Sequence, residues 1–441
     1  MLSLTWLKGP EFGWLTLTCL GAKIAKGSAS RIPAWHCGVN QFTFFCHFAF
    51  IPLMGNSFAL SSGPAGDLQT FRPLANGGPP SDSLSYKSTR LMARAVNGMQ
   101  MALAEAYVNG LEIPDSLYRA MLHSTMPTLF RSFPGLLAPY EWVLTESDRL
   151  AESSGELMKI QYDLPQTMLN TMLGDWEPIY PKYSMGLWEN GAQDLEESQK
   201  QMIDQLIERL GIEDGDQILD FGCGWGCVPN YIMTKFANVR FTGVNLSHQQ
   251  CTYMRAKMND PRSQLSSGRF TLVEGDLNDI EFAEKFDKIV SVGVFCHVGN
   301  LTQSLQKLAS LLKPKGRALI HIITVRIPNN MSSGFTHKYI FPHGRYWNHD
   351  AIPSHSRDLK TVKRWYLNGM NYHQTLTEWL HRFDANQSEF QSLDYGMDYA
   401  RFRRIWRFYL LLLGTIFATC DGEYNGNGQY LLTHADASGL A

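Results

Sequence analysis

The chain has 441 residues, which is enough for one large or two ordinary domains with an ample core. Its composition is that of a globular protein, with 44% hydrophobic and 18% charged residues, and its formal charge of −2 argues against a basic surface that recruits nucleic acid. The eight cysteines are scattered and form no paired CxxC units. We therefore expect no metal site, no disulfide framework, and a reducing, cytoplasmic compartment.

Residues 1–82 are rich in Gly, Ser, Pro and aromatic residues, with few charges and no sustained period. The end of this region is predicted to be a linker, and no function follows from the remainder. An anchor, a disordered leader and a translation start near Met54 stay open as interpretations. The apolar run from Phe42 to Met54 is too short for a transmembrane helix, which needs about 20 apolar residues.

Residues 83–182 are predicted to form a helical cap, because apolar residues recur at every fourth position from Leu91 to Tyr107. Residues 183–324 then alternate predicted helices and strands. The expected helices are 194–211, 228–236, one from 248, and 301–312, and the expected strands are 217–220, 239–244, 270–273, 288–292 and 318–323. This alternation predicts an α/β, Rossmann-like fold with a parallel-rich, doubly wound sheet. Ligands of such sheets bind at the carboxyl ends of the strands.

The sequence QILDFGCGWG at 217–226 carries the clearest motif of the chain. A predicted buried strand ends at Asp220 and opens into a turn with Gly222, Gly224 and Gly226 before a helix. Glycine lets the backbone approach a ligand closely, and the helix start offers unpaired N–H groups. The motif lacks the Lys-Ser or Lys-Thr pair of a phosphate-binding loop and does not match G-x-G-x-x-G. A carboxylate at the strand end suits the amino group of S-adenosylmethionine, so we predict this cofactor and a class I methyltransferase fold.

Later strand ends offer further groups for a nucleoside. Asn245, Leu246 and Gln250 follow the second strand, where ribose hydroxyls are expected to lie. Asp276 follows the third strand, where it can accept a hydrogen bond from the adenine amino group. Each is an ordinary loop residue, and only their order along the sheet favours a ligand site. Asn245-Leu246-Ser247 is also a glycosylation sequon, and a glycan there would block the site, which favours the cytoplasm over secretion.

Two histidines are candidates for the chemistry. His297 follows the fourth strand, where the reactive end of the cofactor is expected to project. His321 lies within the next strand and points either to the core or to the same cavity. For each, a buried histidine with a structural role is the alternative.

Residues 325–398 are predicted to form a lid and substrate region, and residues 399–441 the C-terminal part of the core. The apolar run from Phe408 to Cys420 is interpreted as a buried helix rather than a membrane span. The arginines between Arg401 and Arg407 suit either peripheral contact with acidic lipid headgroups or a solvated helix face. The lid carries aromatic side chains that either line an acceptor pocket or pack against the core, namely Phe335, Tyr339, Phe341, Tyr346 and Trp347.

A colinear set of motifs gives the chain a resemblance to a known family. These motifs are YSMGLW at 183–188, ILDFGCGWG at 218–226, GVNLSHQQ at 243–250, FDKIVSVGVFCHVG at 286–299, LIHIIT at 319–324, IFPHGR at 340–345 and NYHQTLTEW at 371–379. Together they resemble the cyclopropane fatty acid synthase family of S-adenosylmethionine-dependent enzymes, which includes coclaurine N-methyltransferases. The resemblance runs from about residue 160 to residue 432.

The resemblance implies roles for individual residues. The fatty-acid enzymes bind a bicarbonate ion through a Cys, a Glu, a His and a Tyr. His321 and Tyr372 match the last two, but Met185 stands in the Cys position and Cys296 in the Glu position, so a bicarbonate site is not expected. The residues that match the family's cofactor site are Tyr183, Ser184, Gly222, Gly224, Asn245, Leu246 and Gln250, with Asp276 and Val292 near the adenine.

These observations predict a methyltransferase that acts on a small-molecule acceptor, with N-methylation of an amine favoured over an acyl lipid. The protein is expected to supply alignment and water exclusion, while His297, helped by Tyr372 or His321, accepts the departing proton. The alternative is C-methylation or cyclopropanation of unsaturated acyl chains, and a third hypothesis is a cofactor-binding homologue without catalysis. The acceptor, the oligomeric state and the role of residues 1–82 do not follow from the sequence.

Overall fold

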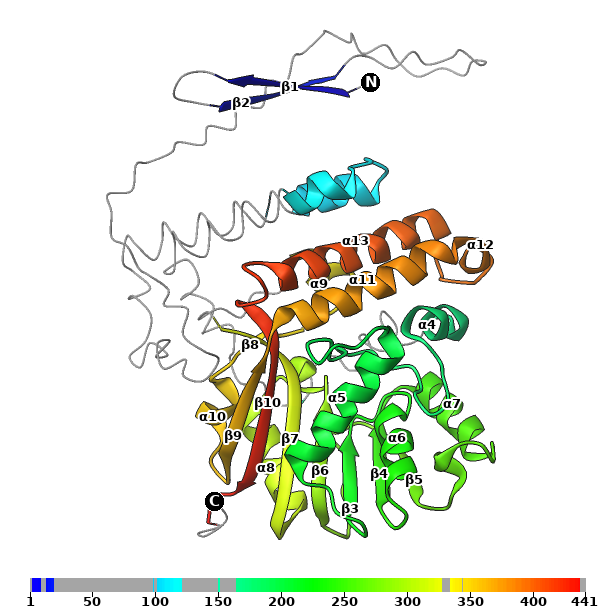
Figure 1. Cartoon of the computed structure of the whole chain (residues 1–441), viewed down its shortest axis with the longest axis vertical. Helices are drawn as coiled ribbons and strands as arrows, with labels where there is room; N and C mark the ends of the chain where they lie inside the picture. The colour runs from blue at the N-terminus through cyan, green and yellow to red at the C-terminus, as the bar shows by residue number, and fades with distance from the viewer. Residues whose placement is uncertain are drawn as a thin grey trace, which may run out of the picture. The chain divides into compact units, whose positions relative to one another are not determined.

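The computed structural model describes residues 2–8, 13–19, 98, 101–120, 150, 164–326, 334–342 and 344–436 (Figure 1). The chain divides into two units, Met1–Leu68 and Gln69–Ala441. In the first unit, β1 (Leu2–Lys8) and β2 (Gly13–Cys19) pair as an antiparallel hairpin. The predicted linker and the apolar run from Phe42 to Met54 lie outside the described residues, as does much of the predicted helical cap.

The second unit is built on a sheet in the order β5-β4-β3-β6-β7-β10-β9, with β8 paired to β7. The strands from β5 to β7 run parallel, whereas β10 lies antiparallel between β7 and β9. This arrangement confirms the predicted Rossmann-like fold with a parallel-rich sheet. The bounds are β3 (Gln217–Phe221), β4 (Arg240–Asn245), β5 (Phe270–Glu274), β6 (Phe286–Val292), β7 (Leu312–Val325), β8 (Trp347–Asn348), β9 (Leu359–Leu367) and β10 (Asn425–His434).

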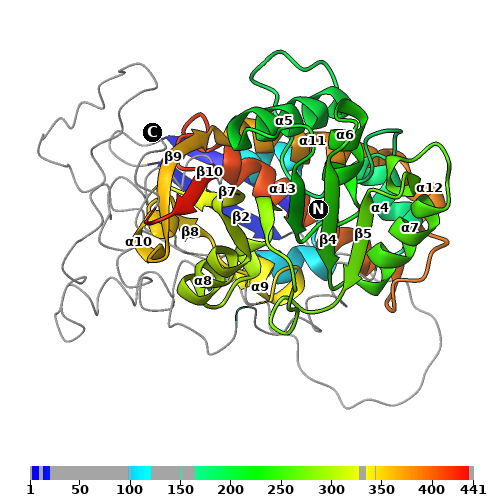
Figure 2. The same cartoon turned by 90° about the horizontal axis from the view of Figure 1, so that it is seen from below.

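Helices cover both faces of this sheet (Figure 2). One face carries α5 (Leu195–Leu210), α6 (Cys227–Lys235) and α7 (His248–Met258), and the other carries α8 (Leu301–Leu311) and α10 (Ala351–His355). The apolar side chains of each face form a core of their own with the sheet. The shorter helices are α4 (Gln166–Leu173), α9 (Gly334–Tyr339), α12 (Gln387–Phe390), η4 (Gln264–Ser266) and η5 (Phe295–His297).

Capping residues explain where the first predicted helix begins and ends. The side chain of Asp194 accepts a hydrogen bond from the backbone N–H of Glu197, which satisfies one of the free donors at the start of α5. Gly211 ends the helix in the left-handed conformation at φ 66°. β7 is longer than the predicted strand at 318–323, because it begins at Leu312 and includes Pro314–Gly316 with a register shift against β6.

Part of the predicted lid region belongs to the sheet itself. β9 forms the sheet edge beside β10, and the end of β9 at Leu367 lies opposite Asn427. Two long helices, α11 (Gly369–Ala385) and α13 (Tyr399–Ala418), pack against each other. Because β10 starts at Asn425 opposite Val325, both helices join the sheet at the carboxyl end of β7, which is where ligands of this fold bind.

α13 contains the apolar run that was interpreted as a buried helix. Its residues from Phe408 to Leu413 are all buried in the core, and no described helix is long and apolar enough to cross a membrane. Two of the arginines before this run are engaged within the protein. Arg403 and Arg407 both bind Asp384, and Arg407 also forms a two-pronged ion pair with Asp115. These two guanidinium groups therefore form ion pairs within the protein.

Candidate active site

A cavity of about 180 Å³ opens at the carboxyl ends of β3, β4 and β6. Its walls contain most of the predicted site residues, which lie far apart in the sequence. Gly226, His321 and Tyr372 do not line it. The predicted residues that do are Tyr183, Ser184, Asp220, Gly222, Gly224, Asn245, Leu246, Gln250, Asp276, Val292 and His297.

Two buried oxygen atoms in the cavity walls have no hydrogen-bond partner in the described part of the chain. They are Oδ2 of Asp220 and Oγ of Ser184, and Asp220 is only 1% exposed to solvent. Burial raises the pKa of Asp220 to about 8. A buried carboxyl without a donor is costly, so a ligand that brings a cationic donor stabilises it. The methionine amino group of S-adenosylmethionine fits this position.

The glycine turn brings the backbone to the cavity wall. Gly222 has φ 98°, and a Cβ atom on it would lie 2.2 Å from Cγ2 of Val294. No side chain fits there without moving Val294, which itself lines the cavity. The glycine at this position is therefore required by both the backbone conformation and the close packing.

Asn245 braces the turn from the next strand. Its Nδ2 atom donates to the carbonyl oxygen of Gly224 at 2.8 Å and to Oε1 of Gln250 at 2.9 Å. Its Oδ1 atom accepts a hydrogen bond from the backbone N–H of Ser247. Both amide hydrogens of Asn245 are therefore used within the protein, and Oδ1 keeps one lone pair that can accept from a ribose hydroxyl.

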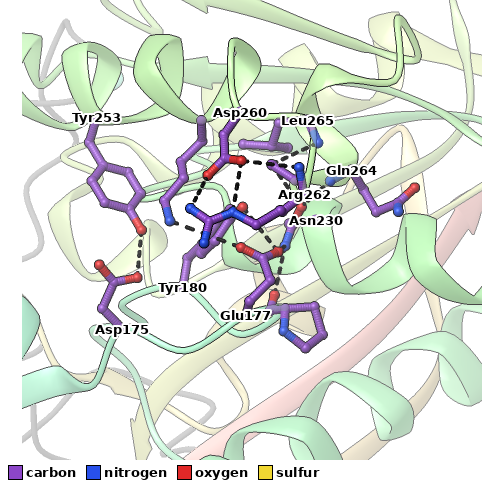
Figure 3. Close-up of polar contacts among 12 residues, drawn as sticks. Asp175, Glu177, Tyr180, Asn230, Tyr253, Asp260, Arg262, Gln264 and Leu265 are labelled. Carbon is purple, nitrogen blue, oxygen red and sulfur yellow. Dashed lines mark hydrogen bonds and ion pairs between the residues drawn. The ribbon is translucent and has the colours of Figure 1, made fainter.

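The segment that enters the cavity from α4 is fastened to the helices beside it (Figure 3). Tyr253 donates a hydrogen bond to Asp175 at 2.7 Å, and Asn230 donates to Oε1 of Glu177 and to the carbonyl oxygen of Pro178. These contacts join the segment to α6 and α7. The path of the chain into the cavity is thus fixed before Tyr183.

The same segment is fastened again where it leaves the cavity. Thr375 Oγ1 on α11 accepts hydrogen bonds from the backbone N–H of Gly186 and from the indole of Trp188. Asn371, one turn earlier, accepts from the backbone N–H of Trp188 at 2.7 Å. The motif YSMGLW is therefore held on both sides, and α11 supports one wall of the site.

Lys182 is a cavity residue that the sequence analysis missed. Its residue is 4% exposed, and its Nζ atom donates to the carbonyl oxygens of Met185 at 2.6 Å and of Ser184 at 3.3 Å. Burial lowers its pKa to about 8. The one sequence signal for Lys182 is that it is the only charged residue in the stretch IYPKY at 179–183.

His297 lines the cavity from η5. Burial lowers its pKa to about 4, so the imidazole is neutral at physiological pH. Its ring stacks on Phe341 at 5.6 Å, and Phe341 in turn contacts Tyr409 at 5.9 Å. Tyr183 donates a hydrogen bond to the hydroxyl of Tyr409 at 3.1 Å. We call Tyr183, Phe341 and Tyr409 the aromatic wall, which lies next to His297.

His321 is bonded by amide groups on both sides. Its Nδ1 atom lies 3.1 Å from Nε2 of Gln429, and its Nε2 atom lies 3.0 Å from Nδ2 of Asn427. Arg209 donates to Oε1 of Gln429 at 2.7 Å, which directs the Gln429 amino group toward His321. Nδ1 is then the acceptor and Nε2 carries the proton. The Asn427 amide is therefore assigned the reverse orientation, in which its oxygen rather than its nitrogen faces Nε2 and accepts this proton.

This bonding engages the lone pair that the predicted role of His321 as a proton acceptor would need. Burial, together with the charges of Lys182 and Arg209, keeps the pKa of His321 well below its usual range. Its one lone pair is occupied by Gln429, and its residue is 1% exposed. These contacts are typical of a structural histidine within the sheet.

The positions that correspond to the bicarbonate ligands offer no carboxylate. Met185 is fully buried, and the Cys296 thiol donates to the carbonyl oxygen of Gly293 at 3.0 Å. Burial raises the pKa of this thiol to about 12, so it is uncharged. Tyr372 packs its ring on Phe417 at 4.5 Å and is 7% exposed.

Comparison with known proteins decides the family. The family described as mycolic acid cyclopropane synthetase matches residues 151–422. The chain is also 30% identical over 356 residues to the cyclopropane-fatty-acyl-phospholipid synthase of Escherichia coli strain K12, covering 78% of this chain and 87% of that protein. The chain belongs to the mycolic acid cyclopropane synthetase family. It is an S-adenosylmethionine-dependent methyltransferase, which confirms the predicted enzyme class and cofactor.

Two further relatives show how the family divides. The methyltransferase is 28% identical over 284 residues to (S)-coclaurine N-methyltransferase of Papaver somniferum, covering 62% of this chain and 78% of that protein. The crystal structure of a coclaurine N-methyltransferase bound to N-methylheliamine and S-adenosylhomocysteine has the same fold, with a TM-score of 0.65 and 22% identity over 76% of this chain and 99% of that one. The relatives thus include both amine and lipid enzymes.

Proposed function

We propose that this methyltransferase transfers the methyl group to the nitrogen of a small amine. The observation that carries the proposal is the pair Met185 and Cys296. A carbon acceptor leaves a carbocation that must lose a proton to a base, whereas an amine attacks with its own lone pair and needs no base of comparable strength. The described residues around these two positions supply a thioether and an uncharged thiol.

The cofactor supplies an activated methyl group for direct displacement, and the protein aligns the acceptor. His297 is suited to this task, because its neutral ring can accept a hydrogen bond from the amine N–H. The burial that keeps His297 neutral also makes it a weak base, so we assign it orientation of the amine rather than complete removal of the proton. The aromatic wall excludes water and offers ring faces to an organic amine.

The test uses the purified full chain with methyl-labelled S-adenosylmethionine, and offers small amines and vesicles of unsaturated phospholipid in separate reactions. Transfer of label to an amine with inert lipids supports the proposal. Transfer to acyl chains contradicts it and favours the second candidate, cyclopropanation or C-methylation, which the similarity to the E. coli synthase supports.

A variant pair tests the role of His297. His297→Phe keeps a ring to stack on Phe341 but removes the hydrogen-bond acceptor. We expect kcat for the amine to fall roughly 10- to 100-fold while cofactor affinity stays near that of the wild type. The exposed His381 on α11 provides the matched control, His381→Phe, which should leave kcat unchanged.

A further inference from the structure

The side chain of Lys182 is a buried positive charge with no acidic partner among the described residues. Its Nζ atom donates to two backbone carbonyl oxygens, those of Ser184 and Met185. An ammonium group has three N–H donors, so one remains. Lys182 lines the same cavity as Asp220 and Ser184. A buried charge that lacks a counter-ion is costly, and the cost is recovered when a ligand supplies one.

Lys182 and Asp220 are a basic and an acidic group in the walls of one cavity. The pKa of the Cys227 thiol is raised by burial, lowered by the charge of Lys182 and raised by that of Asp220. Cys227 lines the same cavity. Neither Lys182 nor Asp220 has an ion-pair partner in the described part of the chain. The walls of this cavity thus contain both an amino group and a carboxyl group without an ion-pair partner among the described residues.

We propose that Lys182 binds the carboxylate of the methionine part of S-adenosylmethionine, while Asp220 binds its amino group. The two residues together recognise the zwitterion. The hydroxyl of Ser184, which lines the same cavity, supplies a further hydrogen bond to the ligand. The two anchored ends of this segment, at Asp175 and Glu177 on one side and at Gly186 on the other, fix Lys182 in place. This inference does not depend on which acceptor is methylated.

Binding measurements can separate this role from a structural one. Three ligands are titrated calorimetrically into the full chain: S-adenosylhomocysteine, its decarboxylated analogue, and 5′-methylthioadenosine, which lacks the whole amino-acid part. The proteins are the wild type, Lys182→Met, and the control Lys315→Met, which removes an exposed lysine.

The expected pattern is selective. Lys182→Met weakens S-adenosylhomocysteine roughly 10- to 100-fold, since a charge-assisted hydrogen bond is lost. The affinities of the other two ligands stay within about twofold of the wild-type values, because these ligands have no carboxylate for Lys182 to bind. Lys315→Met changes none of the three. Equal weakening of all three ligands would show that Lys182 only supports the segment, and unchanged S-adenosylhomocysteine binding would show that it does not contact the carboxylate.

A measurement on the wild type covers the case in which Lys182→Met does not fold. A bound carboxylate raises the pKa of the ammonium, which burial has lowered to about 8, so the lysine takes up a proton on binding near this pH. Titration in buffers of different ionisation enthalpy counts these protons. After correction for protons that the amine of each ligand gains or loses, binding of S-adenosylhomocysteine should be accompanied by more proton uptake than binding of its decarboxylated analogue. Equal proton uptake overturns the proposal.

Discussion

The Nδ1 atom of His321 accepts a hydrogen bond from Gln429, whose orientation is set by Arg209. A histidine in the middle of β7 was a plausible base, because it matches a bicarbonate ligand of related enzymes. Its actual partners are two amides of β10, which lies directly beside β7. The antiparallel register of these strands, which pairs His321 with Gln429, therefore determines the chemistry available to His321.

The first prediction concerns His321→Ala. The variant leaves the side chains of Gln429 and Asn427 buried without their partner, which should lower the free energy of unfolding by about 2–5 kcal/mol. In the folded protein, kcat should stay within about threefold of the wild type, since the lone pair of His321 is not free. Denaturant unfolding and initial rates below the transition measure the two effects. A large loss of kcat with unchanged stability would restore His321 as a catalytic residue.

The second prediction concerns Asp220→Asn without cofactor. Burial raises the pKa of Asp220 to about 8, so the folded state retains a proton that the unfolded state has lost above about pH 4. The wild type therefore loses stability through this group as the pH rises from about 4 to about 8, by up to about 5 kcal/mol. The amide introduced by Asp220→Asn has no proton to lose in this range, so the variant should become the more stable protein at pH 9.

The same substitution should weaken S-adenosylhomocysteine, because the amide cannot balance the ligand's ammonium group. We expect a loss of roughly 100-fold in affinity. Unfolding curves at pH 5 and pH 9 and calorimetric titrations give both values. Parallel pH profiles for the two proteins would show that Asp220 is not perturbed in the wild type.

The third prediction compares two glycines that both have positive φ. Gly222→Ala places a methyl group against Val294, whereas Gly268→Ala, at φ 75°, meets no atom within 4 Å. Gly268→Ala should cost about 1 kcal/mol from backbone strain alone, and Gly222→Ala about 2–4 kcal/mol together with loss of cofactor binding. Adding Val294→Ala to Gly222→Ala should recover part of the stability. Equal costs at the two glycines would mean that the clash is relieved by small shifts.

The sequence was sufficient to predict that residues at the strand ends meet at the cavity, although it did not indicate Lys182. In a parallel sheet, successive strand ends lie at one edge, so Asp220, Asn245 and Asp276 had to converge once the strands were recognised. The sequence did not predict that the Asn245 side chain forms a hydrogen bond with the glycine turn. That depends on the 2.8 Å distance between Asn245 and the carbonyl of Gly224, which no local pattern encodes.

The last strand, β10, could not be recognised in the sequence for a different reason. β10 begins with Asn425, Gly426, Asn427 and Gly428, residues that are typical of turns rather than strands. They are all buried, and a Cβ atom on Gly426 would lie 2.3 Å from the carbonyl oxygen of Leu367 on β9. The glycines are therefore required by close approach between neighbouring strands, so tertiary packing overrides the local preference.

The last prediction concerns the pH dependence that His297 contributes to stability. Burial lowers its pKa to about 4, so the unfolded state binds a proton below about pH 6.5 that the folded state refuses until about pH 4. Stability from this group is present above pH 6.5 and is lost as the pH falls through this window. Because His297 lines a cavity that water can enter, the loss is at most about 3 kcal/mol.

His297→Phe should flatten the profile of unfolding free energy between pH 6.5 and pH 4 by a similar amount. His349, whose pKa burial also lowers to about 4, contributes a slope of the same sign that remains in the variant. Unfolding by urea at several pH values provides the comparison. If the slope of His297→Phe matches the wild type, His297 gains and loses its proton over the same pH range in the folded and unfolded states, and burial does not lower its pKa.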